Sequence, residues 1–141
     1  QQLDPAAREN LIVGSNYYYT IDNPENKKFV EAYKKKFKGV PPGYAGAAGY
    51  GLMKMTLLGM QKSGSTEPQK VITALEEHKG KNFVGDFEIR GRNHQTVRPF
   101  FVLQTKKKNE MKNQYDMAEV VDVSSTEQPK NINMCKDIGS F

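Results

Sequence analysis

The spacing of apolar residues changes several times along the chain, and each change marks an expected element. Residues 11–13 form a short apolar run of β-type residues, and Ser15, Asn16 and three tyrosines at 17–19 follow it. This order predicts a buried strand that ends in a polar and aromatic loop. The preceding residues 3–9 are typical of a short polar helix.

Two helices are expected next. In residues 24–37 the apolar side chains recur at helical spacing and form one stripe: Phe29, Val30, Tyr33 and Phe37. Asn23 before Pro24 is a favourable helix start, and Gly39 is a favourable end. Residues 43–63 predict a second helix with apolar side chains almost all round, which implies burial on more than one side.

The second half of the chain passes from helical to alternating spacing. A third helix is predicted from Thr66, which would form a capping box with Gln69, as far as Gly80. Residues 83–90 alternate between apolar and polar side chains and predict a half-buried strand. After a turn, residues 97–104 predict a second strand that pairs with the first.

Residues 117–123 are expected to form one more short element. The predicted order is therefore a strand, three helices, two strands and a tail. A single strand beside three helices cannot complete an α/β sheet, because its backbone N–H and C=O groups need neighbouring strands. We therefore expect an α/β fold that is incomplete on its own and does not fold alone.

The positive charge of the chain is the first feature with a bearing on partners. The net charge is +5, and much of the excess lies in lysine runs at residues 34–38 and 106–108. Each run lies at the end of an expected element, where lysines stay solvated. A nucleic-acid site would mix basic residues with groups that stack on bases. We therefore expect no nucleic-acid partner, and a basic nucleic-acid-binding module is kept only as the weakest alternative.

No pattern in the chain supports an enzyme. His78 and His94 lack the spacing of a metal site or of a nucleophile with its base. Asp86 and Glu88 share one strand face without the surroundings of an acid–base pair. The glycines of residues 43–51 lack the dinucleotide-binding spacing after a strand. We predict no catalytic residue, no metal site and no cofactor.

Four strings in a specific order resemble the type I periplasmic solute-binding proteins, in the branch of the Leu/Ile/Val-binding proteins and their relatives for aromatic acids and amides. They are LIVGSNYYY, NPENKKFVEAYKKKFKGVPPGYAGAAGYGLMKM, GSTEPQKVITALE and FVGDFEIRGRNHQTVRPFFVLQTK. The likeness covers about residues 10–123. Members of this family have two Rossmann-like α/β lobes joined by three crossings, and they bind ligand in the cleft between the lobes. The chain would be a C-terminal fragment of such a protein.

The resemblance implies a division of the chain between the lobes. Residues 1–20 would be the last strand and the cleft loop of the C-terminal lobe. Residues 21–95 would return to the N-terminal lobe as helices and a strand, and residues 96–141 would be the final strand that crosses back, followed by the tail. The remaining N-terminal part of the same protein would supply most of both sheets.

The resemblance also implies ligand-binding residues. Asn16, Tyr17 and Tyr18 follow the C-terminal end of a strand, where open α/β sheets place ligands. Tyr44 opens a helix at a position where relatives often place an aromatic residue against the ligand. We expect Tyr18 and Tyr44 to face each other across the cleft and to hold an apolar or aromatic part of the ligand. The groups that hold the charges of the ligand are expected from the missing part.

The predicted function is that of the extracytoplasmic substrate-binding component of an ABC importer. Its ligand would be a branched-chain or other amino acid, or an aromatic acid or amide, and its other partners would be the membrane subunits of the transporter. A signal peptide is expected upstream, and Cys135 is expected to form a disulfide with a cysteine of the missing part. The alternative is the sensor domain of a receptor or transcription regulator of the same fold.

Overall fold

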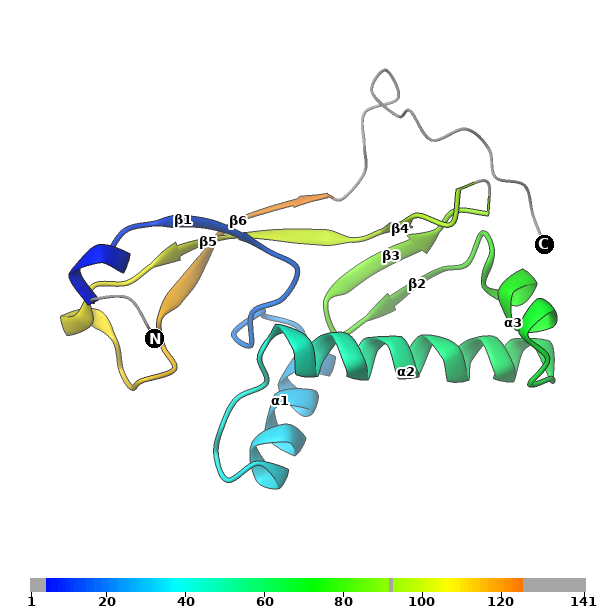
Figure 1. The fold of residues 1–141 in the computed structure, drawn as a ribbon, viewed down its shortest axis with the longest axis horizontal. Coiled ribbons are helices and arrows are strands. Elements are labelled where there is room, and N and C mark those ends of the chain that lie inside the picture. Colours follow the sequence, from blue (N-terminus) through cyan, green and yellow to red (C-terminus); the bar gives the residue numbers. More distant parts are fainter. Residues whose placement is uncertain (1–4, 92, 126–141) are drawn as a thin grey trace, which may run out of the picture.

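The computed structural model describes residues 5–91 and 93–125, which form two three-stranded antiparallel sheets and three α-helices (Figure 1). The strand order is β1-β5-β6 in one sheet and β2-β3-β4 in the other. The helices are α1 Pro24–Lys36, α2 Tyr44–Ser63 and α3 Pro68–Leu75, with short 3-10 turns η1 Pro5–Arg8 and η2 Lys108–Glu110. The strands are β1 Ile12–Ser15, β2 Lys79–Asn82, β3 Gly85–Ile89, β4 Thr96–Val97, β5 Pro99–Thr105 and β6 Ala118–Ser125.

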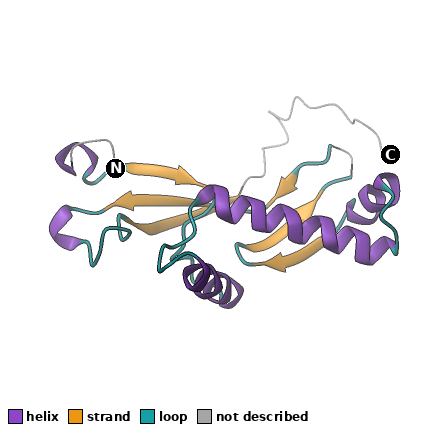
Figure 2. Cartoon of the chain, turned by 60° about the horizontal axis from the view of Figure 1, so that its bottom comes forward, coloured by secondary structure: helices purple, strands orange, loops and turns teal. Residues whose placement is uncertain are grey.

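The two sheets lie at opposite ends of the described chain and are joined by the run from β4 into β5 (Figure 1). The long helix α2 runs alongside the β2-β3-β4 sheet, and α3 folds back against the far end of α2 (Figure 2). Helix α1 lies below the middle of the molecule, near the start of α2. The loop after β1 and the start of α2 therefore come close to the place where the two sheets meet.

Helix α1 confirms the predicted start and end. The side-chain oxygen of Asn23 accepts hydrogen bonds from the backbone N–H groups of Glu25 at 2.8 Å and Asn26 at 3.2 Å, and Pro24 is the first helical residue. Gly39 adopts a left-handed φ of 85° just after the helix, which glycine does without steric cost. Local sequence chemistry thus determines both ends of α1.

Strand β1 lies where a strand is predicted, but it is neither solitary nor buried. It pairs antiparallel with β5, with Ile12 opposite Gln104 and Ser15 opposite Phe101. Ser15 is half-buried, and the other three residues of β1 are exposed. The apolar run predicts burial, yet β1 forms the edge of its sheet among the described residues.

Helix α2 has the predicted length, but the prediction of burial on more than one side is wrong for the described chain. Of its residues only Ala47 and Gly59 are buried, while Leu52 is 70% exposed and Leu57 is also exposed. Helix α3 packs closely against α2 at Gly59, where a Cβ atom would lie 2.7 Å from Cγ1 of Val71. Much of the apolar surface of α2, including Leu52, Met53 and Leu57, is therefore exposed in the described chain.

Helix α3 is shorter than predicted at both ends. Glu67 is its N-cap residue and makes no side-chain capping bond, so the predicted capping box at Thr66 does not form. The N–H of Glu67 instead donates to the hydroxyl of Ser65 at 3.0 Å. The helix ends at Leu75, before Gly80, because the following residues turn back to begin β2.

The strands of the second half follow the prediction with one addition. The segments 97–104 and 117–123 are confirmed as β4 with β5 and as β6, and the segment 83–90 contains β3, with Phe83 and Val84 in the turn before it. They do not form one long hairpin, because β4 pairs with β3 while β5 pairs with β1 and β6. The added strand β2 has the sequence KGKN, which carries no alternating apolar signal. Its pairing with β3 includes ion pairs from Lys79 to Glu88 at 3.2 Å and from Lys81 to Asp86 at 3.4 Å.

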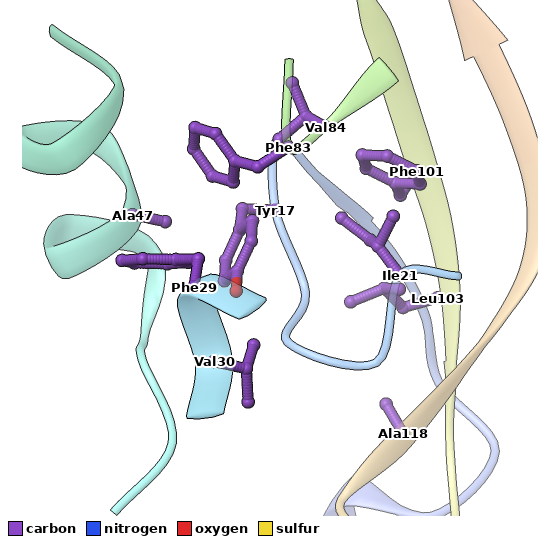
Figure 3. Packing of buried hydrophobic residues seen from close by; sticks show 10 residues of the cluster. All are labelled: Tyr17, Ile21, Phe29, Val30, Ala47, Phe83, Val84, Phe101, Leu103 and Ala118. Carbon is purple, nitrogen blue, oxygen red and sulfur yellow. The ribbon is translucent and has the colours of Figure 1, made fainter. Parts of the chain in front are cut away.

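One cluster of buried side chains joins these elements (Figure 3). Its members come from the loop after β1, both long helices, the β2–β3 turn and the far sheet: Tyr17, Ile21, Phe29, Val30, Ala47, Phe83, Val84, Phe101, Leu103 and Ala118. The ring of Phe29 stacks on Tyr50 at 4.3 Å between centroids and lies 5.3 Å from Phe83. This packing fixes the loop after β1 against the start of α2.

Candidate functional site

A hollow of about 320 Å³ lies between the first half of α2 and the β2-β3-β4 sheet. Its lining combines residues from the loop after β1, from α2, from the sheet and from the β4–β5 junction: Asn16, Tyr17, Tyr44, Ala47, Ala48, Gly51, Leu52, Met55, Asn82, Phe83, Val84, Phe87, Ile89, Thr96 and Arg98. A second hollow of about 420 Å³ continues along α2 and β2. The first one contains three of the four predicted ligand-binding residues.

Tyr44 and Asn16 lie at this hollow, as a ligand-binding role would require. Tyr44 is the first residue of α2 and is 57% exposed, so its ring is available at the surface. Asn16 follows directly after β1 and is half-buried. Gly46 lets α2 approach α1 closely, because a Cβ atom there would lie 3.0 Å from the Tyr33 hydroxyl oxygen.

Tyr17 also lines the hollow, but most of the residue belongs to the core. Its exposed fraction is 4%, and its hydroxyl donates to Oδ1 of Asn26 at 2.9 Å. Burial raises the pKa of the Tyr17 hydroxyl well above its usual value. Because the hydroxyl is bonded to Asn26, only part of the Tyr17 ring lines the hollow.

Tyr18 lies away from the hollow, and the structure does not bring it together with Tyr44. Its hydroxyl donates to the carbonyl oxygen of Tyr115 at 3.3 Å and accepts the N–H of Ala118 at 3.0 Å. Its ring lies 5.0 Å from that of Tyr19, and burial raises the pKa of Tyr19 to about 12. Tyr18 thus ties the loop after β1 to the start of β6.

Three polar residues of the hollow, Asn82, Thr96 and Arg98, are absent from the sequence prediction. Asn82 accepts the N–H of Val84 at 2.9 Å through its side chain and the side-chain amide of Asn23 at 3.0 Å through its carbonyl. Arg98 stands between β4 and β5, inside the segment 97–104 that the sequence predicts as one strand, and Thr96 begins β4 just before that segment. The proline at 99 was the available sign that this strand is interrupted.

The lysine runs take separate structural roles. The ammonium group of Lys34 lies 5.6 Å from the ring centre of Tyr19, and that of Lys106 pairs with Asp116 at 2.8 Å.

Within residues 5–91 and 93–125 no group of three or more His, Cys, Asp or Glu side chains is placed to hold a metal ion. No helix in those same ranges is long and apolar enough to span a membrane. Cys135 lies outside the described residues, so its disulfide stays a prediction.

Comparisons with known proteins agree on one family. The sequence profile described as "Periplasmic binding protein" matches residues 1–110. The amino acid ABC transporter substrate-binding protein from Pseudomonas fluorescens Pf-5 is 26% identical, with a TM-score of 0.82 over 92% of this chain and 34% of that chain. No curated protein sequence matches the chain significantly.

Two further solved structures share the fold at lower identity. The solute binding protein of an ABC transporter from Rhodopseudomonas palustris BisB5, in complex with 3,4-dihydroxy benzoic acid, is 20% identical with a TM-score of 0.73, over 89% of this chain and 33% of that chain. The leucine-, isoleucine-, valine-, threonine-, and alanine-binding protein from Brucella ovis is 21% identical with a TM-score of 0.72, over 88% and 34%. The chain spans about a third of the length of these structures. The matches confirm the resemblance and the fold drawn from the sequence.

Proposed function

Because this chain belongs to the periplasmic binding protein family, we propose that it forms the closing part of an extracytoplasmic solute-binding protein that delivers a small organic ligand to the membrane subunits of an ABC importer. The observation that carries the proposal is the hollow at the start of α2, where Asn16 and Tyr44 come together from distant parts of the chain. The protein would bind its ligand without converting it, since its relatives are solute-binding proteins.

The two sheets support a division of the chain between two lobes. Residues 1–20, with β1, belong in this proposal to the C-terminal lobe, and residues 96–141 return there through β5 and β6. Residues 21–95, with the three helices, β2 and β3, belong to the N-terminal lobe. In this division the hollow, which is lined by Asn16 and by Thr96 and Arg98 of the β4–β5 junction, would border both proposed crossings between the lobes. A ligand held there would contact both lobes, which is how two-lobed binding proteins close around a solute.

The exposed apolar surface of α2 is evidence for the proposal that another part of the protein precedes this chain and packs against α2. Exposed large apolar side chains along one helix mark a surface that another element covers, and Leu52, Met53 and Leu57 are all exposed on α2. The preceding segment would provide the strands that fill the space beside α2. We therefore still expect that the 141-residue chain alone does not melt cooperatively; a monodisperse monomer with a sharp melting transition would contradict this.

The function is tested with the full-length protein, meaning this chain together with the segment proposed to precede it. A thermal-shift screen of amino acids, aromatic acids and amides should find a ligand that raises Tm. Tyr44→Ala should then weaken binding by roughly tenfold to a hundredfold, because a buried aromatic contact contributes about 1–3 kcal/mol. Tyr44→Phe keeps the ring and separates its contribution from that of the hydroxyl.

The control is Phe37→Ala, which truncates a half-exposed ring at the end of α1, away from the hollow. It should leave ligand affinity unchanged. Because the Tyr44 side chain is largely exposed, Tyr44→Ala should change Tm of the ligand-free protein little. A lowered Tm with unchanged affinity would identify Tyr44 as a packing residue and would reject this site.

A further inference from the structure

Positive charge is concentrated along α1 and at its end. Residues 27–38 contain six lysines and a single acidic residue, Glu31. The C-terminal end of a helix attracts cations, but its partial negative charge is only about half a unit. The helix end therefore accounts for at most one of these lysines, and most of the positive charge is in excess of what α1 itself can attract.

Four of the six lysines have no charge partner in the part of the chain that the structure describes. Lys27 pairs with Asp22 at 2.6 Å, and Lys34 lies 5.6 Å from the ring centre of Tyr19. The others are exposed, and no ion pair or cation–π contact involves them among the described residues: Lys28, Lys35, Lys36 and Lys38. Their ammonium groups are available to an anionic partner.

Two large apolar side chains are exposed beside these lysines. Phe37 is 45% exposed, and Val40 is 41% exposed. The ring of Phe37 lies 4.2 Å from that of Tyr33 between centroids, and Tyr33 packs in turn on Phe29 of the buried cluster. Phe37 is thus anchored to the core while almost half of it stays at the surface. We call the following residues the basic tip: Lys35, Lys36, Phe37, Lys38 and Val40.

Backbone hydrogen bonds hold the basic tip in a defined turn. The N–H of Phe37 donates to the carbonyl oxygen of Tyr33 at 2.9 Å, and that of Gly39 donates to the carbonyl oxygen of Lys34 at 2.8 Å. Lys38 and Gly39 both adopt left-handed φ angles, 51° and 85°, as is common where a helix ends. Helix α1 and this turn project to one side of both sheets (Figure 1, Figure 2). The basic tip is therefore a preformed projection.

We propose that the basic tip binds the anionic headgroups of a phospholipid membrane and holds the protein at the surface in which its transporter lies. Lysines are point charges on flexible stems, so they fit a surface of many negative charges without a groove. The exposed parts of Phe37 and Val40 enter the interface between headgroups and acyl chains. Membrane binding of this kind goes beyond the proposed function and takes from it only the location outside the cytoplasm.

Two observations favour a lipid surface over other anionic partners. A peptide is recognised in a groove or at a strand edge, whereas neither hollow beside α2 is lined by the basic tip and no strand lies in it. A nucleic-acid site would add groups that stack on or read bases, and outside the cytoplasm the protein meets a membrane instead. Charge together with exposed apolar side chains on one projection is the combination that membrane surfaces bind.

The test is co-sedimentation of the full-length protein with phosphatidylcholine vesicles, prepared with and without phosphatidylglycerol. The wild type should bind the vesicles that contain phosphatidylglycerol, and high salt should release it, because salt screens exposed charges. The triple variant Lys35→Gln, Lys36→Gln, Lys38→Gln should weaken this binding about a hundredfold, because each lysine near an anionic surface contributes about fivefold. Phe37→Ser should weaken it by about threefold to tenfold through lost apolar contact.

The matched control removes the same charge elsewhere. It is the triple variant Lys107→Gln, Lys108→Gln, Lys112→Gln, at exposed sites in and after η2. This control should stay within about threefold of the wild type in vesicle binding, because interactions between exposed charges fall off over about 10 Å. Circular dichroism should show the same fold for both triple variants, since every replaced lysine is exposed.

Three results would overturn the inference. Equal binding of the wild type to vesicles with and without phosphatidylglycerol would exclude an anionic membrane site. An equal loss for the two triple variants would show attraction by net charge and no role for the basic tip. Binding of the basic tip to poly-glutamate without binding to vesicles would identify an acidic protein surface as the partner. Solute binding is measured separately by thermal shift, so each of these results leaves the proposed function standing.

Discussion

The replacement Asn26→Ala should destabilise the protein more than a typical substitution in the first turn of a helix. Asn26 is completely buried, with an exposed fraction of 0%. Its Oδ1 accepts the hydroxyl of Tyr17 at 2.9 Å, and its Nδ2 donates to the carbonyl oxygens of Tyr19 at 3.1 Å and Ile21 at 2.9 Å. Since carbonyl oxygens only accept, the orientation of the amide is determined by its partners. One side chain therefore bonds three residues of the loop between β1 and α1.

The magnitude follows from the groups that lose a partner. The Tyr17 hydroxyl and the Tyr19 carbonyl lose the partner given above, whereas the Ile21 carbonyl still accepts the N–H of Asn23 at 3.0 Å. Each buried polar group left without a hydrogen bond costs about 1–3 kcal/mol. The two costs do not add fully, because the loop can shift and admit water, so we expect a total loss of about 2–4 kcal/mol. The better helix propensity of alanine returns only about 0.6 kcal/mol. The net effect is about two to three times the roughly 1 kcal/mol of an average substitution.

The measurement is equilibrium urea denaturation of the full-length protein, followed by circular dichroism. Tyr17→Phe removes one of the three bonds and should cost about 1–2 kcal/mol. The double variant should lose less than the sum of the single losses by about 1 kcal/mol, because both changes remove the same bond. Gln69→Ala, at an exposed site of α3, is the control and should stay within about 0.5 kcal/mol. A loss below about 1 kcal/mol for Asn26→Ala, or strict additivity with Tyr17→Phe, would refute this account of the loop.

Two further predictions concern packing and pH. Gly59→Ala should lower the free energy of unfolding in urea by about 1–2 kcal/mol despite the helix propensity of alanine, because its Cβ would lie 2.7 Å from Cγ1 of Val71. The control is Gly49→Ala on the same helix, whose Cβ would meet no atom within 4 Å. It should be neutral or stabilising. Asp116→Ala should cost about 1.5–3 kcal/mol near pH 7, because Asp116 accepts a charge-assisted bond from Lys106 at 2.8 Å. The bond to Lys106 lowers the pKa of Asp116 in the folded protein below its usual value. The stability that Asp116 contributes is therefore present above about pH 4 and is lost as the pH falls through the lowered pKa. An equal cost of Asp116→Ala near pH 7 and near pH 2 would contradict this prediction.

The sequence by itself determined the elements whose signals are local. Asn23, Pro24 and Gly39 act within a few residues, so both ends of α1 follow from chain chemistry. The alternation in residues 83–90 predicted β3 for the same reason. The order of four family-like strings indicated the solute-binding fold, which the comparisons confirm. In β2 the polar sequence KGKN carried no such signal, and pairing with β3 alone makes it a strand.

Only the tertiary structure decided which of the consecutive tyrosines faces which neighbour. Residues 17–19 are chemically alike, and their directions depend on partners far away in the chain: Tyr18 is held by Tyr115 and Ala118, 97 and 100 residues later. In the same way, β1 depends on β5 for its pairing, and Arg98 reaches the hollow because β4 and β5 pair with different strands. Spacing along a sequence reports periodicity over a few residues. The assignment of a side chain to core, surface or cleft is made by contacts between segments that only folding brings together.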